Sequence, residues 1–113
     1  MNYNTYAQLL KEAKNYKDLR TWVAAYGYPA DCPYAPSELL EMLQIIYEAS
    51  HEDIKALVSH SRSMAAFSRR FCVPYSTVDK WCDNLFSPHV AMIYLIGFAL
   101  INDIPTEQEI KNE

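Results

Sequence analysis

The sequence predicts an all-α protein. Apolar residues recur three or four positions apart in most segments, which is the spacing of one face of an α-helix. Only two glycines occur among the 113 residues, and half of the residues are hydrophobic, so the chain is long enough to bury a core without disulfide or metal staples. We find no strict apolar–polar alternation, the pattern of a half-buried β-strand. A helical bundle is therefore the expected architecture.

Two short helices are expected at the N-terminal end. The first should span about 5–15, with Asn4 or Thr5 as its N-cap. The second should span about 17–26 and end at Gly27, since glycine is a common helix stop. The residues expected on the buried faces of both helices are Tyr6, Leu9, Leu10, Ala13, Leu19, Trp22, Val23 and Tyr26.

The clearest internal boundary lies at residues 27–36, which hold three of the six prolines and break any helix. Residues 1–35 would then form an N-terminal helical hairpin that ends in this proline-rich boundary. Residues 36–102 would form the main helix bundle, and residues 103–113 a polar tail.

The bundle should begin with two helices, at about 37–50 and from residue 51 or 52 to about 59. Their apolar residues fall on one stripe each, as expected for helices that cover a core. The residues expected on these inner stripes are Leu39, Leu40, Leu43, Ile46, Tyr47, Ile54, Leu57 and Val58.

Two further helical patterns, 64–71 and 75–84, are separated by a very short break, Cys72-Val73-Pro74. Ser63 can cap the first helix, and the hydroxyls of Ser76 or Thr77 could cap the start of the second. The apolar residues on one face are Phe67 and Phe71 in the first helix and Val78 and Trp81 in the second. Two short helices joined by so tight a turn make a helix-turn-helix, whose second helix can enter a DNA major groove.

The last helix is expected at about 88–102 and contains no charged side chain. A helix that is apolar all round lies either in the centre of a core or in a subunit interface. Both positions are open for a domain of this size, and we expect a homodimer with part of this helix at the interface.

The run FSRRFCVPYSTVDKW, residues 67–81, resembles the helix-turn-helix of the Xre- or Cro-like family, the phage-repressor class. It is similar in particular to small bacterial and phage-associated proteins, in which a proline-led apolar helix follows, here from Pro88. Family members usually have glycine where Cys72 stands, because that position often takes a left-handed conformation. Many also have glutamine where Met64 stands.

The resemblance implies a sequence-specific DNA-binding protein that regulates transcription and binds duplex DNA as a dimer, because one helix reads only a half-site. The residues that it places towards the groove are Tyr75, Ser76, Thr77, Asp79 and Lys80. Lysine favours guanine acceptors, serine bonds either donors or acceptors, and tyrosine can touch a thymine methyl or a sugar. The candidates for phosphate contacts are Arg69, Arg70 and Asn84.

The net charge of −4 is unevenly distributed along the chain. Residues 1–54 carry four basic and eight acidic side chains, whereas residues 55–102 carry five basic and two acidic ones. Residues 103–113 carry one basic and four acidic side chains. The basic excess therefore coincides with the helix-turn-helix pattern, as phosphate binding requires.

The pattern of polar residues predicts neither catalysis nor a cofactor. The three histidines and three cysteines are scattered, with no close pairing that a metal would need and no Gly-rich loop for phosphate. The cysteines, Cys32, Cys72 and Cys82, are expected to be small buried hydrophobic residues. No apolar run reaches the roughly 20 residues that cross a bilayer, and no signal-peptide pattern opens the chain, so we expect a cytoplasmic protein.

A second hypothesis rests on the aromatic residues of the first third of the chain. Tyrosine and tryptophan are enriched at interface hot spots, so this acidic region could bind a protein partner. The residues concerned are Tyr6, Tyr16, Trp22 and Tyr26. The protein would then be a phage-encoded inhibitor or adaptor that uses the helix-turn-helix as a scaffold. The same aromatics could instead pack a helical hairpin onto the core.

Overall fold

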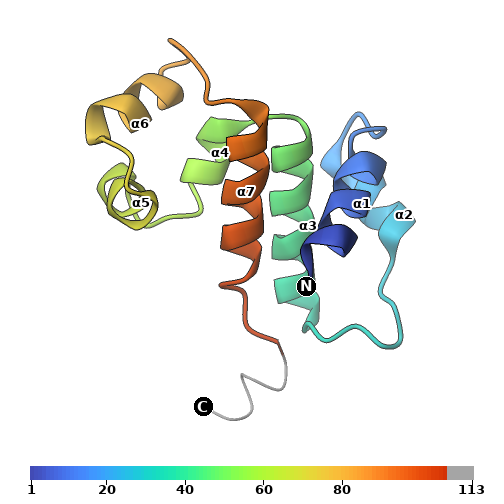
Figure 1. Cartoon of the computed structure of the whole chain (residues 1–113). Coiled ribbons are helices and arrows are strands. Elements are labelled where there is room, and N and C mark those ends of the chain that lie inside the picture. The colour runs from blue at the N-terminus through green and yellow to red at the C-terminus, as the bar shows by residue number, and fades with distance from the viewer. Residues whose placement is uncertain (107–113) are drawn as a thin grey trace.

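The computed structural model describes residues 1–106, which form seven helices with no strand among them (Figure 1). The helices are α1 (Tyr3–Ala13), α2 (Leu19–Tyr26), α3 (Pro36–Ser50), α4 (Ile54–Val58), α5 (Met64–Phe71), α6 (Tyr75–Cys82) and α7 (Val90–Ile101). The predicted all-α class is confirmed for this part of the chain. None of these helices is both long and apolar enough to cross a membrane. Of the predicted polar tail, residues 107–113 lie outside the described residues.

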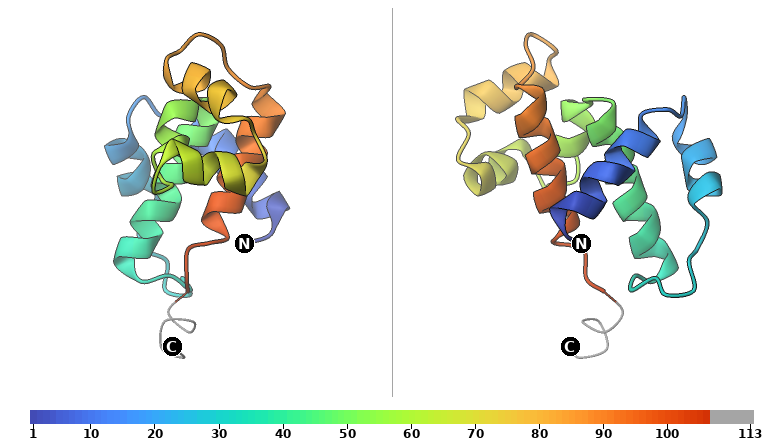
Figure 2. Two further views of the ribbon diagram at one scale, coloured as in Figure 1. Left: turned by 90° about the vertical axis from the view of Figure 1, so that its left-hand side faces the viewer. Right: turned by 45° about the vertical axis from the view of Figure 1, so that its right-hand side comes forward.

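Helices α3 and α7 lie side by side at the centre of the molecule, and the others pack around this pair (Figures 1 and 2). Both α1 and α2 pack on α3, whereas α4 contacts α3 and α7 together. Helices α5 and α6 pack against each other, and α4 connects them to the centre. The α5–α6 pair therefore stands at one end of the molecule and α2 at the other.

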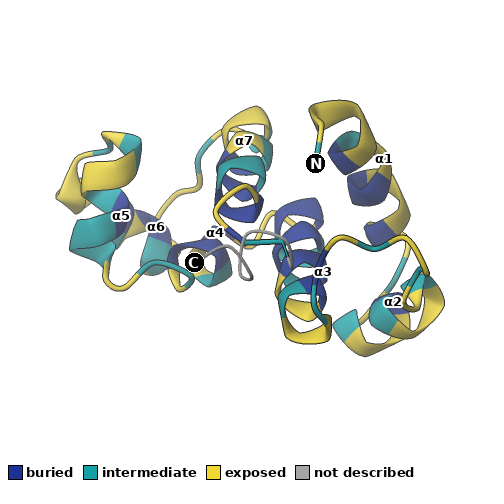
Figure 3. Cartoon of the chain, turned by 90° about the horizontal axis from the view of Figure 1, so that it is seen from below, coloured by how far each residue is buried: buried dark blue, intermediate teal, exposed yellow. Residues whose placement is uncertain are grey.

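The hydrophobic core is continuous between these two ends. The buried side chains of Tyr6 and Trp22, in the N-terminal third, belong to the same cluster as Phe67 and Trp81. Seen from below, the buried residues of α1, α3 and α7 face the centre of the fold (Figure 3). The predicted boundary at residue 35 thus separates chain segments that share one core.

Helix α7 lies in the centre of this core, one of the two positions that its apolar composition predicted. Its buried residues are Ile93, Ile96, Gly97, Leu100 and Ile101. On the other face, Met92 is 44 % and Leu95 is 56 % exposed, so part of this apolar helix faces solvent in the single chain.

Helix α1 is fastened to α7 through one buried tyrosine. The Tyr6 hydroxyl donates a hydrogen bond to the Tyr94 carbonyl at 2.6 Å, and burial raises the pKa of that hydroxyl far above its ordinary value. The close approach needs Gly97, because a Cβ there would lie 2.5 Å from the Tyr6 hydroxyl oxygen and 3.0 Å from the Ala49 Cβ. The N-terminal segment is therefore an integral layer of the fold.

The first two helices begin where a side chain can accept from a free amide. The Asn2 side chain accepts from the Thr5 amide at 2.9 Å, so α1 starts earlier than predicted and neither Asn4 nor Thr5 is its cap. The Asp18 carboxylate accepts from the Thr21 amide at 2.8 Å, so α2 starts later than predicted. In both cases the helix starts directly after the residue whose side chain accepts this bond, and the predicted bounds were wrong by about two residues.

Side chains that accept from a free backbone amide also set the starts of three later helices. The predicted cap of α5 is confirmed, since the Ser63 hydroxyl accepts from the Ala66 amide at 3.0 Å. Asp53 caps α4, and the Nδ1 of His89 accepts from the Ala91 amide at 3.1 Å at the start of α7. Both helices are consequently shorter than predicted.

The buried face of α3 differs from the predicted stripe. Leu40 is 48 % exposed and Tyr47 is half-buried, whereas Met42 and Ile45 are buried. Because α3 contacts α1, α2, α4 and α7, its buried surface covers a wider arc than a single apolar stripe indicates. In α2, Trp22 alone of the four predicted residues is fully buried.

The expectation of buried cysteines was wrong for Cys72 and holds only in part for Cys32 and Cys82, which pack against the core. All three are free thiols, with Cys72 exposed and Cys32 and Cys82 half-buried. Cys72 is exposed because it is the left-handed residue that ends α5 at the surface. Within residues 1–106, no group of three histidine, cysteine or carboxylate side chains is placed to hold a metal ion.

Candidate nucleic-acid interface

The turn between α5 and α6 is closed by a compact set of hydrogen bonds. Cys72 has φ 55° and ψ 39°, the left-handed conformation expected at this position. The Val73 amide donates to the Ser68 carbonyl at 3.1 Å, and the Ser68 hydroxyl donates to the Val73 carbonyl at 2.5 Å. These bonds end α5 and fix the direction in which the chain enters α6.

Helix α6 begins without a side-chain cap. Its N-cap is Pro74, whose carbonyl accepts from the amides of Thr77 and Val78 at 2.9 and 3.1 Å. The prediction that Ser76 or Thr77 caps this end was wrong, because the capping position belongs to a proline, which has no hydrogen-bonding side chain. The exposed Ser76 hydroxyl is therefore not engaged at the helix start.

Two buried residues anchor α6, and both were predicted to point inward. Val78 is fully buried and Trp81 is 4 % exposed. The Trp81 ring meets the buried Phe67 ring edge-on, with the ring centroids 6.4 Å apart. Since Val78 and Trp81 lie on one face, they fix the rotation of α6 about its axis.

The opposite face of α6 is turned outward. Tyr75 is 50 % exposed, and Ser76 and Lys80 are exposed as well. Thr77 and Asp79 are half-buried at the edges of this face. The first turn of the helix thus presents an aromatic ring and a hydroxyl, with an ammonium group one turn further on.

The two arginines of α5 have different surroundings. Arg69 lies exposed in the last turn of the helix. Arg70 instead reaches the C-terminal end of α7, where its guanidinium donates to the Ala99 carbonyl at 3.1 Å and pairs with the carboxylate of Asp103, just after the helix. The same guanidinium lies 5.0 Å from the centroid of the Phe71 ring. Sequence reasoning grouped these two neighbours, and the fold separates them.

Asn84 ends α6 in a left-handed conformation with φ 60°. The Leu85 amide donates to the Lys80 carbonyl at 3.0 Å, which satisfies one of the last helix carbonyls. Asparagine tolerates this conformation better than most residues, so Asn84 has a structural reason to be there. It is exposed and lies directly after the outward face of α6.

An ion pair between His60 and Glu48, close to this region, could not be predicted from the sequence. The Nε2 of His60 lies 2.6 Å from a carboxylate oxygen of Glu48, with both side chains largely buried. This hydrogen bond raises the pKa of His60, although burial opposes the shift. The pair ties the segment before α5 to α3. Twelve residues separate the partners, so helical spacing could not have paired them.

A shallow apolar cavity of about 290 Å³ adjoins the α5–α6 turn. Its walls are Phe71, Val73, Met92, Leu95, Ile96 and Ala99. It is therefore formed by the exposed face of α7 together with the end of α5 and the turn. The sequence indicated α7 as an interface candidate but not this contribution from the turn.

The aromatic residues of the first third mostly pack on one another. Tyr6 is fully buried and Trp22 is 2 % exposed, which leaves neither with surface for a partner. Tyr16 and Tyr26 are half-buried, and both rings contact the Trp22 ring, with centroids 5.7 and 5.8 Å apart. These contacts favour the packing interpretation of the aromatics over the interface interpretation.

No protein-family model, no curated protein and no solved structure matches this chain. The function of the outward face of α6 must therefore be inferred from its geometry and chemistry.

Proposed function

We propose that this protein is a sequence-specific DNA-binding protein of the Xre- or Cro-like helix-turn-helix class that regulates transcription in the cytoplasm. The observation that carries the proposal is the division of α6 into two faces at the outer end of the molecule. Val78 and Trp81 hold one face in the core, while Tyr75, Ser76 and Lys80 lie outward. A helix held in this way can enter a major groove with its first turn leading.

The side chains on the outward face suit the edges of base pairs. The Ser76 hydroxyl can donate or accept, the Lys80 ammonium favours the acceptors of guanine, and the Tyr75 ring suits a thymine methyl or a sugar. Thr77 and Asp79 would limit the fit at the borders of the contact, because both are half-buried.

Phosphate contacts would come from the residues around α6. Arg69 is exposed and supplies a positive charge next to the turn. Asn84 lies at the other end of α6 and can donate from its amide. Arg70 would have to leave Asp103 to reach a phosphate, so we assign it mainly to holding α5 against α7.

We infer that the DNA-bound form is a homodimer, because one α6 helix reads only a half-site. The cavity beside the α5–α6 turn and the exposed Met92 and Leu95 provide an apolar surface on α7 for a second copy. Leu95→Lys should give a monomer in light scattering at concentrations where the wild-type protein is a dimer. A wild-type protein that is still monomeric at a concentration on the order of tens of micromolar would contradict the dimer.

Enrichment from a randomised duplex library tests the proposed function. The wild-type protein should select one sequence motif. Ser76→Ala or Lys80→Ala should relax the preference at one or two base pairs, at a cost of about 1–3 kcal/mol. Lys11→Ala, on the exposed side of α1, removes a lysine far from α6 and should leave the motif unchanged. No selected motif, together with capture of a protein partner, would favour the adaptor hypothesis.

A further inference from the structure

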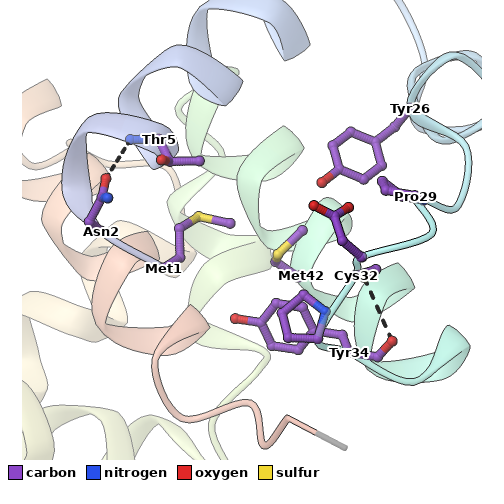
Figure 4. A pocket seen from close by; sticks show the side chains of 10 residues that line it. Met1, Asn2, Thr5, Tyr26, Pro29, Cys32, Tyr34 and Met42 are labelled. Carbon is purple, nitrogen blue, oxygen red and sulfur yellow. Dashed lines mark hydrogen bonds between the residues drawn. The ribbon is translucent and has the colours of Figure 1, made fainter.

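A second cavity lies in the N-terminal half of the molecule and plays no part in the proposed DNA contact. It has a volume of about 340 Å³ and is bordered by the start of α1, the end of α2, the proline-rich loop and α3 (Figure 4). The residues that matter for its chemistry are Met1, Tyr26, Asp31, Cys32, Tyr34 and Met42. This volume is within the range of small-molecule sites, which begins at about 300 Å³.

The loop that forms one wall is held by its own hydrogen bonds. The Tyr28 hydroxyl donates to the Tyr34 carbonyl at 2.6 Å, and the Cys32 thiol lies 3.7 Å from the same oxygen. The Cys32 amide donates to the Pro29 carbonyl at 3.1 Å. Tyr34 is 6 % exposed, so its side chain packs into the fold. The cavity is thus largely preformed, which lowers the entropy lost when a ligand binds.

The cavity has a carboxylate on the side of the proline-rich loop. Among the described residues that line it, Asp31 has the one charged side chain, and Met1 contributes the amino terminus, a positive group on the side of α1. Burial, together with the nearby Cys32, Glu12 and Asp31, raises the pKa of the Tyr26 hydroxyl, which points towards this cavity (Figure 4). A cation placed beside Tyr26 would be attracted by the Asp31 carboxylate.

The walls favour an organic cation over a metal ion. The rings of Tyr26 and Tyr34 border the cavity, and aromatic faces attract cations through their quadrupole. The thioethers of Met1 and Met42 add polarisable apolar surface. A metal would need several oxygen, nitrogen or sulfur ligands, and no such group occurs within residues 1–106.

We propose that this cavity binds a quaternary ammonium group, with Asp31 balancing its charge and the Tyr26 and Tyr34 rings packing on its methyl groups. The site is independent of α6, so its failure and that of the DNA-binding proposal are separate outcomes. Choline is a suitable probe, because its cationic head is small enough for the cavity and it lacks an acidic group.

The test is a titration of the full chain, with methyl-labelled methionines, by choline chloride at constant ionic strength. Met1 and Met42 should shift along one saturable curve, with a Kd on the order of 1 mM for so small a ligand. Met64 and Met92 lie outside the cavity and serve as internal controls that should not shift. The lack of a saturable shift at Met1 and Met42 would overturn the proposal.

Charge and ring contributions are separated by matched ligands and variants. Dimethylbutanol, the neutral carbon isostere of choline, should bind at least about fivefold more weakly. Asp31→Asn should weaken choline binding about threefold to fivefold, and Tyr26→Leu about fivefold or more. Tyr26→Phe keeps the ring and should stay within about twofold. Asp83→Asn, an exposed aspartate beyond α6, should change nothing.

Equal affinity for the neutral isostere, or choline binding unaffected by both Asp31→Asn and Tyr26→Leu, would refute the ammonium site. Asp31 is exposed, so its variant should fold even if the tyrosine variant is destabilised. A short peptide that contains trimethyl-lysine carries the same group on a macromolecule. Tighter binding of that peptide through the same methionines would identify a protein as the source of the ligand, and tighter binding of choline a free metabolite.

Discussion

The two ends of this molecule each bury a tryptophan and differ in which helices that ring holds in place. At the N-terminal end, Tyr6 and Trp22 are buried, and they fasten α1 and α2 to the central helices. At the other end, Trp81 is buried under α6 while Tyr75, on the same helix, is 50 % exposed. A count of aromatics would mark the N-terminal end as the interface. Exposure argues against Tyr6 and Trp22 as interface residues, because a buried ring has no surface to offer a partner, whereas Tyr3 and Tyr28 at this end are 40 % and 52 % exposed.

The first prediction concerns the two buried tryptophans, one at each end. Trp22→Ala and Trp81→Ala should each destabilise the protein by about 3–5 kcal/mol, because both remove a large ring from the core. Denaturant unfolding of each variant gives the free energy directly. If Trp22→Ala left the stability unchanged, the Trp22 ring would not be buried. It would then not hold the N-terminal helices on the core.

The second prediction tests how tightly α1 is joined to α7. Gly97→Ala should destabilise the fold by about 1–3 kcal/mol, because the added Cβ would collide with the Tyr6 hydroxyl and press on Ala49. Combining it with Tyr6→Phe removes the nearest atom and should recover part of the loss. A double-mutant cycle by thermal unfolding measures this coupling. Strictly additive effects of the two substitutions would show that α1 does not pack on Gly97 in this way.

The third prediction concerns pH and has a smaller expected effect. Because its folded pKa is raised, protonated His60 stabilises the fold fully below its unfolded pKa of about 6.5. That contribution is lost as the pH rises through the folded pKa. As the pH rises through the folded pKa of His60, the Tm of the wild-type protein should therefore decrease. This part of the decrease should be absent in His60→Gln. His51→Gln, a more exposed histidine, is the control. An identical pH profile for wild type and His60→Gln would rule out the Glu48 pair.

Local signals in the sequence were enough for most features around the candidate site, although not for the cap at the start of α6. The Ser63 cap, the left-handed position at Cys72 and the inward Val78 and Trp81 are all set by neighbours a few residues away. The same reasoning missed the exposure of Leu40, because the packing of four helices around α3 decides it.

Contacts between distant segments could not be read from the sequence at all. Arg70 and Asp103 lie 33 residues apart, and their pairing engages one of the arginines that were predicted to contact phosphate. The cavity beside Tyr26 depends on how the proline-rich loop packs against α1 and α3. The composition of this loop identified it only as a boundary. Helical periodicity reports which face of a helix is buried but not which residues from elsewhere meet it.

The salt dependence of DNA binding tests the central claim most directly. Fluorescence anisotropy of a labelled duplex should show an affinity that falls linearly with salt on a double logarithmic scale. Arg69→Ala should lower that slope by about one, as expected for one lost phosphate contact, while Arg20→Ala on α2 should leave it unchanged. An affinity that is absent or independent of salt, or equal effects of Arg69→Ala and Arg20→Ala, would contradict DNA recognition by the α5–α6 pair.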